Sequence, residues 1–137
     1  MAQRMPKTTR KQKPTIAPEL IQKRLDAIYG PIHWRPRMIA LDELIFTVLT
    51  QHTSDLNAER SYDALRKAMP TWASVIEAET QKIADAIHHG GLANQKSVRI
   101  QQILIKILHR LGHFELEFLS DLPLEEARSW LTSLPGV

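Results

Sequence analysis

The sequence predicts an all-α protein, and two observations carry that prediction. Aromatic residues make up only 6% of the 137 residues, and alternation of β-branched with polar residues is scarce, so strand signals are weak. Apolar residues recur instead at spacings of three and four, which places them on one face of a helix. Because 43% of the residues are apolar, we expect one domain with a sizeable core.

The first two helices are bounded by proline, glycine and a capping residue. The first is expected to begin at Pro18, because proline suits the first helical turn, and to end at Gly30. The second is expected after Leu41, with Asp42 as its N-cap. It is apolar on nearly all sides as far as Leu49, so we expect it in the centre of the core.

Five further helices are expected between turn signals. Thr53 or Ser54 can cap the next one, and Pro70 ends it. Asn94 is expected to cap the longest helix, whose apolar stripe runs until Gly112 stops it. The four shorter helices are expected over about residues 55–68, 72–76, 80–87 and 124–131.

The positive charge is concentrated at the start of the chain. The net charge is +3, whereas residues 1–14 carry +5 and no acid, which leaves about −2 for the remainder. We expect residues 1–14 to be a disordered basic tail, either a solubilising extension or an arm for DNA phosphates. No stretch has the apolar length of a signal peptide or a membrane span, so we expect no membrane partner and a cytoplasmic location, at the nucleoid in a bacterium or archaeon.

The break after the second helix contains Gln51, His52 and Thr53. An amide at such a helix end can both donate hydrogen bonds to base edges and accept them. Capping would by itself explain Thr53 and the following Ser54, but Gln51 is not needed for capping. All three residues before Ser54 are therefore candidate DNA contacts.

The break before the longest helix sets Leu92 at the tip of a glycine-flanked loop, with Asn94 and Lys96 at the helix start. An exposed leucine is usually ordinary surface. In proteins that bend DNA, however, an apolar wedge enters between base steps and unstacks them. We keep both interpretations of Leu92 and count all three residues as candidate DNA contacts.

The run Leu134-Pro135-Gly136-Val137 follows a short helix and resembles the first half of a helix-hairpin-helix turn. Such a turn presents backbone N–H groups and a helix N-terminus to a phosphate. Leu134 and Gly136 are therefore candidate contacts to the DNA backbone, and we expect the second half of the motif to lie outside this chain.

Together these breaks resemble the endonuclease III family of DNA glycosylases, within the helix-hairpin-helix superfamily, over about residues 41–137. The resemblance implies that Gln51 fills the gap left by a flipped base. It implies that Leu92 wedges into the opposite strand, with Ala93 standing where the family has tyrosine. A duplex that has lost a base from its stack collapses unless the gap is occupied, which is the physical reason for both roles.

The family's chemistry belongs to residues that this sequence does not contain. The resemblance implies a nucleophilic lysine three residues beyond Val137, which attacks the sugar C1′ to form a Schiff base, and an aspartate further on. We therefore expect no catalytic residue here and an inactive N-terminal fragment of a DNA glycosylase/AP lyase. Thr47 stands where adenine glycosylases have a catalytic glutamate, which argues against adenine excision.

Many family members also bind a 4Fe–4S cluster through four C-terminal cysteines. This sequence has no cysteine, so we expect no cofactor in it, and a cluster would belong to a longer parent protein. The pair His88-His89 lacks a third ligand at a useful spacing, so we expect no metal site.

The resemblance also implies a domain organisation. Residues 38–137 would form part of a helical barrel ending in half of the helix-hairpin-helix, and residues 15–37 a separate first helix and connector. In the family the first helix packs on C-terminal helices. We therefore expect exposed apolar surface on the first helix at Leu20, Ile21, Leu25 and Ile28, and along the stripe of the longest helix where later helices should dock.

The expected partner is double-stranded DNA with a damaged base or an abasic site, bound by a monomer. Two alternatives stay open on the sequence. The chain could be a non-enzymatic helical DNA-binding module, in which no lysine follows the hairpin. It could also be a helical protein-interaction domain with an incidental basic tail.

Overall fold

The computed structural model describes residues 17–33 and 35–137, and these form helices and turns without a strand. The chain divides into two units, Met1–Arg35 and Pro36–Val137. The basic tail expected over residues 1–14 lies outside the described residues, as do residues 15, 16 and 34 of the expected first helix and connector. In the described part, no helix has the length and apolar character to cross a bilayer.

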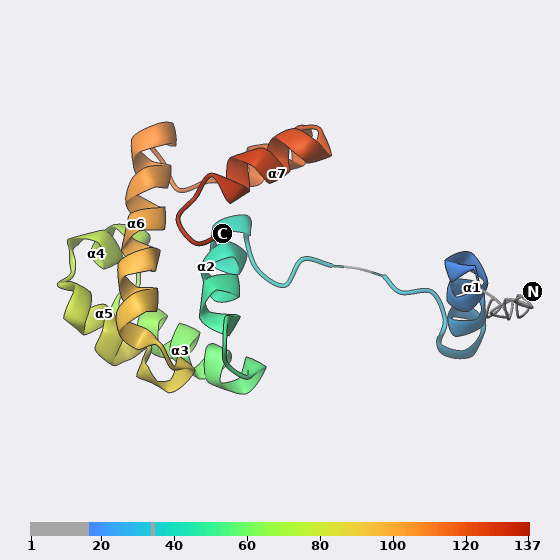
Figure 1. Ribbon diagram of the computed structural model, residues 1–137, viewed down its shortest axis with the longest axis horizontal. Coiled ribbons are helices and arrows are strands. Elements are labelled where there is room, and N and C mark those ends of the chain that lie inside the picture. Colours follow the sequence, from blue (N-terminus) through green and yellow to red (C-terminus); the bar gives the residue numbers. More distant parts are fainter. Residues whose placement is uncertain (1–16, 34) are drawn as a thin grey trace, which may run out of the picture. The chain divides into compact units, whose positions relative to one another are not determined.

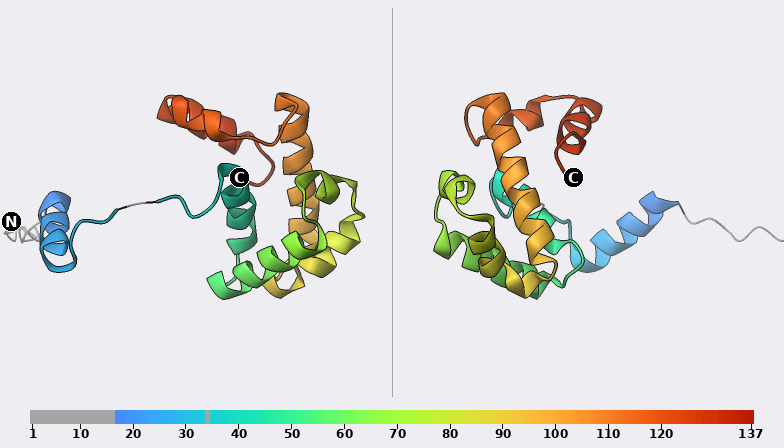
Figure 2. Two further views of the ribbon diagram at one scale, coloured as in Figure 1. Left: turned by 180° about the vertical axis from the view of Figure 1, so that it is seen from behind. Right: turned by 60° about the vertical axis from the view of Figure 1, so that its left-hand side comes forward.

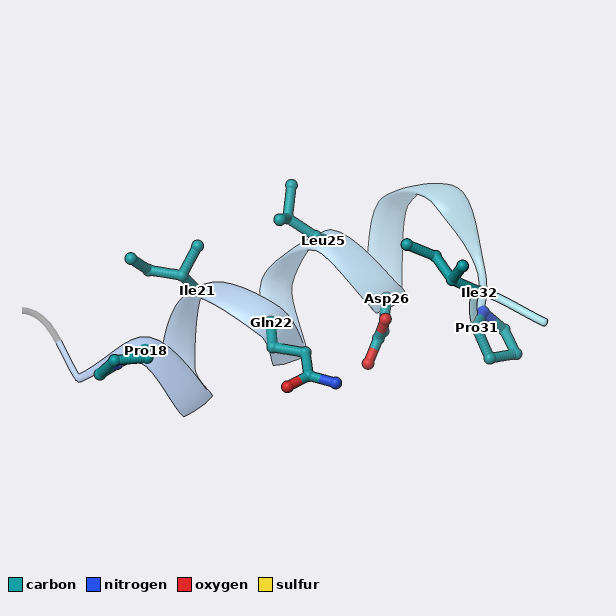
Figure 3. A pocket seen from close by; sticks show the side chains of 7 residues that line it. All are labelled: Pro18, Ile21, Gln22, Leu25, Asp26, Pro31 and Ile32. Atoms are coloured by element: carbon teal, nitrogen blue, oxygen red, sulfur yellow. The ribbon is translucent and has the colours of Figure 1, made fainter. Parts of the chain in front are cut away.

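The first unit contains α1 (Pro18–Tyr29), which begins and ends where the sequence predicts. Gly30 ends it with a φ of +79°, a conformation that glycine adopts without steric cost. Figure 3 shows Ile21 and Leu25 projecting together from one side of the helix, beside a shallow pocket. Leu25 is 48% exposed and Ile28 is 71% exposed, so the predicted apolar face of this helix is confirmed.

The second unit is built around α6, its longest helix, as Figures 1 and 2 show. Helices α2, α4 and α5 pack against α6, and α3 packs against α2 and α5. The bounds are α2 (Ala40–Thr50), α3 (Asp55–Ala68), α4 (Trp72–Glu77), α5 (Thr80–Ala86), α6 (Ala93–Leu111) and α7 (Leu124–Thr132). Two short 3-10 helices, η1 (His88–Gly90) and η2 (Glu117–Asp121), precede α6 and α7.

The core lies between α6 and the helices that pack on it. The stripe of α6 is buried completely at four positions, Ile100, Ile103, Leu104 and Ile107. The expectation that this stripe would be exposed is therefore wrong except near the helix end, because α2, α4 and α5 already cover it. Leu108, beyond them, is 38% exposed.

Two predicted caps are also wrong. Helix α2 begins one turn earlier than expected, after Ile39, and Asp42 lies within its first turn. There the Asp42 carboxylate accepts a hydrogen bond from the Trp72 indole N–H at 3.0 Å, which ties α2 to α4. Helix α6 likewise starts before Asn94, and Leu92 is its N-cap without a side-chain hydrogen bond.

Candidate nucleic-acid interface

The Gln51 turn, residues 50–54, joins α2 to α3. Ser54 caps α3 by accepting a hydrogen bond from the Asn57 N–H. Of the two alternatives predicted for this cap, Thr53 and Ser54, the second is therefore confirmed. His52 is exposed and has a φ of +56°, and Thr53 is half-buried. Gln51 follows the last turn of α2, with its side chain half-buried.

The Leu92 loop, residues 90–92, joins η1 to α6. Gly91 and Leu92 both have positive φ, +66° and +51°, and Leu92 is 49% exposed. The left-handed conformation costs a leucine roughly 1–2 kcal/mol. Among the described residues other than glycine, only His52 and Leu92 adopt positive φ, so backbone strain is confined to the two loops that the sequence analysis singles out.

A buried lysine ties these two loops together. The Lys96 ammonium donates to the carbonyl oxygens of Leu49, at 2.7 Å, and Gly90, at 2.9 Å. Leu49 lies in the last turn of α2, where carbonyls have no partner within the helix, and Lys96 supplies one. Burial lowers the pKa of Lys96, since no solvent compensates its charge.

The prediction that Lys96 contacts DNA is therefore replaced by a structural role. Only 2% of the residue is exposed, and its donors face protein carbonyls rather than solvent. Each carbonyl that it binds lies two residues before a predicted contact, Gln51 in one loop and Leu92 in the other. Lys96 thus fixes the separation of the two loops.

An arginine that the sequence analysis missed joins the Gln51 turn to the C-terminal turn, residues 133–137. Arg99 Nη1 donates to Gln51 Oε1 at 2.8 Å, and Gln51 Nε2 donates to the Gly136 carbonyl oxygen at 3.3 Å. A Cβ atom at Gly136 would overlap the Arg99 side chain. The available signal was spacing, because Arg99 follows Lys96 by three residues and so shares its side of α6.

The remaining predicted contacts divide between surface and core. Asn94 is exposed in the first turn of α6, where a DNA backbone could reach it. Leu134 is only 3% exposed and packs in the core, so its side chain does not reach a phosphate. Gly136 is exposed, with a φ of +74°, and its carbonyl is the group that meets Gln51.

Two adjacent histidines, both in η1, are the pair considered as metal ligands from the sequence. The rings of His88 and His89 lie 3.8 Å apart between centroids, and His88 Nδ1 lies 2.6 Å from the Asp85 carbonyl oxygen. Among the described residues, no three histidine, aspartate or glutamate side chains are grouped to hold a metal ion. Because the sequence contains no cysteine, it offers no thiolate ligand to an iron–sulfur cluster.

Comparison with known families decides what kind of protein carries these loops. The sequence model of the HhH-GPD superfamily of base excision DNA repair proteins matches residues 45–134, from within α2 to the start of the C-terminal turn. This chain belongs to that superfamily. The match includes the Gln51 turn, the Leu92 loop, Lys96 and Arg99.

Individual HhH-GPD relatives agree with this assignment. The chain is 37% identical over 97 residues to "Putative DNA glycosylase At3g47830" of Arabidopsis thaliana, covering 71% of this chain and 33% of that protein. It is 30% identical over 74 residues to the DNA glycosylase/AP lyase ROS1 of the same plant, covering 53% of this chain and 5% of ROS1. The chain thus spans a third or less of the length of these two relatives.

The HhH-GPD fold is also found among solved structures. The crystal structure of H. pylori 3-methyladenine DNA glycosylase (MagIII) bound to 1,N6-ethenoadenine superposes with a TM-score of 0.67 at 25% sequence identity. The match covers 86% of this chain and 58% of that one. The all-helical architecture expected from the sequence, that of a glycosylase of this superfamily, is therefore confirmed.

Proposed function

We propose that this chain is the part of a base excision repair DNA glycosylase that binds and distorts double-stranded DNA around a damaged base or an abasic site. One observation carries the proposal. The Gln51 turn, the Leu92 loop and the C-terminal turn are all joined to the same side of α6, through Lys96 and Arg99. Three segments far apart in the sequence therefore act as one surface.

The two loops divide the work of distortion. Leu92 presents a half-exposed apolar side chain that can enter between base steps, at an unstacking cost of a few kcal/mol. Gln51 presents an amide that can occupy the gap left by an extruded nucleotide and bond to the base opposite. The strained backbone at Leu92 supports this role, because strain persists where a side chain must be held at a particular point.

We propose that the chemistry of the whole protein is that of an endonuclease III-like glycosylase/AP lyase. In such a reaction a lysine amine attacks C1′, the glycosidic bond breaks, and the base departs as the Schiff base forms. Lys96 does not fit that role, because its ammonium is buried and bonded to two carbonyls. The described residues would bind and orient the DNA, and the nucleophile would follow the C-terminal turn.

The proposal is tested by the binding preference of this chain. Fluorescence anisotropy would compare a duplex containing a tetrahydrofuran abasic-site analogue with the same duplex undamaged. We expect tighter binding to the abasic duplex by about tenfold, which corresponds to about 1.4 kcal/mol. Equal affinity for both duplexes would favour a general DNA-binding module, and no binding to either would favour a protein-interaction domain.

A further inference from the structure

The Gln51 amide is held at both ends by groups of opposite character. Arg99 Nη1 donates to its oxygen at 2.8 Å, and its nitrogen donates to the Gly136 carbonyl at 3.3 Å. A guanidinium can only donate hydrogen bonds, and a carbonyl can only accept them. The two neighbours therefore fix which way the amide faces.

Arg99 uses its charge for this amide and not for a carboxylate. Within the described residues, no acidic side chain lies within salt-bridge distance of Arg99. The guanidinium instead lies against Gly136, whose missing side chain gives it room. Arg99 is half-buried on α6, a helix fixed by the core, so it is a firm support for a side chain on a neighbouring turn.

We propose that Arg99 is a positioning residue that holds Gln51 ready to fill the gap in a distorted duplex. The inference rests on the proposed function of Gln51. A free glutamine side chain has several rotatable bonds, and fixing it when DNA binds lowers the affinity. With Arg99 and Gly136 in place, that ordering is complete before the DNA arrives. The second lone pair on Oε1 and the second N–H on Nε2 stay available to the base opposite.

The competing account is that Arg99 binds a phosphate itself. In that case its contribution would not depend on Gln51, would be similar on damaged and undamaged DNA, and would fall with salt concentration. The positioning role of Arg99 predicts the opposite result. It requires that Arg99 contributes only while Gln51 is present and only on the duplex that has a gap.

A double-mutant cycle separates the two accounts. The wild-type chain, Arg99→Met, Gln51→Ala and the double variant would be measured by anisotropy on abasic-analogue and undamaged duplexes at several salt concentrations. We expect Arg99→Met to weaken binding to the abasic duplex by about three- to tenfold and to leave undamaged binding unchanged. In the Gln51→Ala background, we expect no further loss. Arg99→Lys keeps a donor and is expected to recover part of the affinity.

Charge and folding are controlled within the same experiment. Arg60→Met removes an exposed arginine from α3 and is expected to leave the preference for the abasic duplex unchanged. Thermal melts of every variant show whether the fold is retained.

The cycle also separates failure of this inference from failure of the proposed function. Additive losses with a shallower salt slope on both duplexes would overturn the positioning role and assign Arg99 to a phosphate. If Gln51→Ala reduced the preference while Arg99→Met did not, the inference alone would fail. If Gln51→Ala had no effect, the proposed function itself would fail.

Discussion

The ammonium of Lys96 lies 2.7 Å from the carbonyl oxygen of Leu49, in the last turn of α2. The same group binds the carbonyl oxygen of Gly90, so one cation joins the ends of two helical segments. Burying a charge away from a compensating acid is costly, and here hydrogen bonds to carbonyl dipoles offset that cost. Gln51 and Leu92, the residues that we assign to DNA distortion, each lie two residues beyond one of these carbonyls.

Replacing this lysine is expected to destabilise the fold. In Lys96→Met the two carbonyls lose their donor while the side-chain volume is nearly kept, so we expect a loss of about 2 kcal/mol in the free energy of unfolding. Chemical denaturation measures it. Lys82→Met, which removes an exposed lysine from α5, is the matched control and should change stability by no more than about 0.5 kcal/mol. Equal effects of the two substitutions would contradict the structural role of Lys96.

The same variant has a predicted pH dependence. The pKa of Lys96 is lowered from its ordinary 10.5, so the unfolded chain keeps this proton to higher pH than the folded chain does. Stability from this group therefore rises as the pH increases from the folded-state pKa towards 10.5. The advantage of the wild-type chain over Lys96→Met should therefore grow as the pH rises towards 10.5. A constant difference would show that Lys96 has an ordinary pKa.

Gln51→Ala tests the gap-filling role. Removing the amide leaves the gap in the duplex empty, so we expect binding to the abasic duplex to weaken by about tenfold, or about 1.4 kcal/mol, and binding to undamaged duplex to change little. Competition anisotropy measures both affinities. Gln81→Ala, which removes an exposed glutamine from α5, should leave both unchanged. Equal losses on the two duplexes would contradict gap filling.

Two substitutions at Leu92 distinguish the effect of backbone strain from that of the side chain. At a φ of +51° alanine carries the same steric cost as leucine, whereas glycine does not. We therefore expect Leu92→Gly to be more stable than Leu92→Ala by about 1 kcal/mol, the reverse of the usual order. Thermal denaturation tests the order, and both variants should lose preference for the abasic duplex. A less stable glycine variant would mean that the loop does not hold the left-handed conformation.

Two leucines with predicted surface roles should respond differently to truncation. Leu134→Ala empties part of the core and is expected to cost about 2–5 kcal/mol, because the residue is 3% exposed. Leu25→Ala should change stability by no more than about 0.5 kcal/mol and reduce binding of an apolar dye to the α1 face. An unchanged free energy of unfolding in Leu134→Ala would contradict the burial of Leu134 in the core.

Helix positions could be predicted where the signal is local. Pro18 and Gly30 bound α1, Ser54 caps α3, and Gly112 ends α6, all through the conformation or hydrogen bonding of nearby backbone. Asp42 was misassigned because the sequence does not show a tertiary partner, and the Trp72 indole takes the carboxylate that would have served as a cap.

The candidate site was predicted only in part for the same reason. Gln51 stands out because capping of the next helix does not require it. Leu92 stands out because it is an apolar residue at the tip of a glycine-flanked loop. The roles of Lys96 and Arg99 depend on partners 47 and 48 residues away, Leu49 and Gln51. The three-residue spacing of the two basic residues indicates a shared side of α6, but it does not identify these partners. Burial of Leu134 likewise depends on the packing of the whole unit.

The claim that the two loops open DNA can be measured directly with 2-aminopurine, whose fluorescence rises when it leaves the base stack. The base would be placed beside an abasic-site analogue in a duplex saturated with protein. We expect fluorescence to rise with the wild-type chain and to stay near that of free duplex with the variant that combines Gln51→Ala and Leu92→Ala. An equal rise with both proteins at saturation would contradict the account.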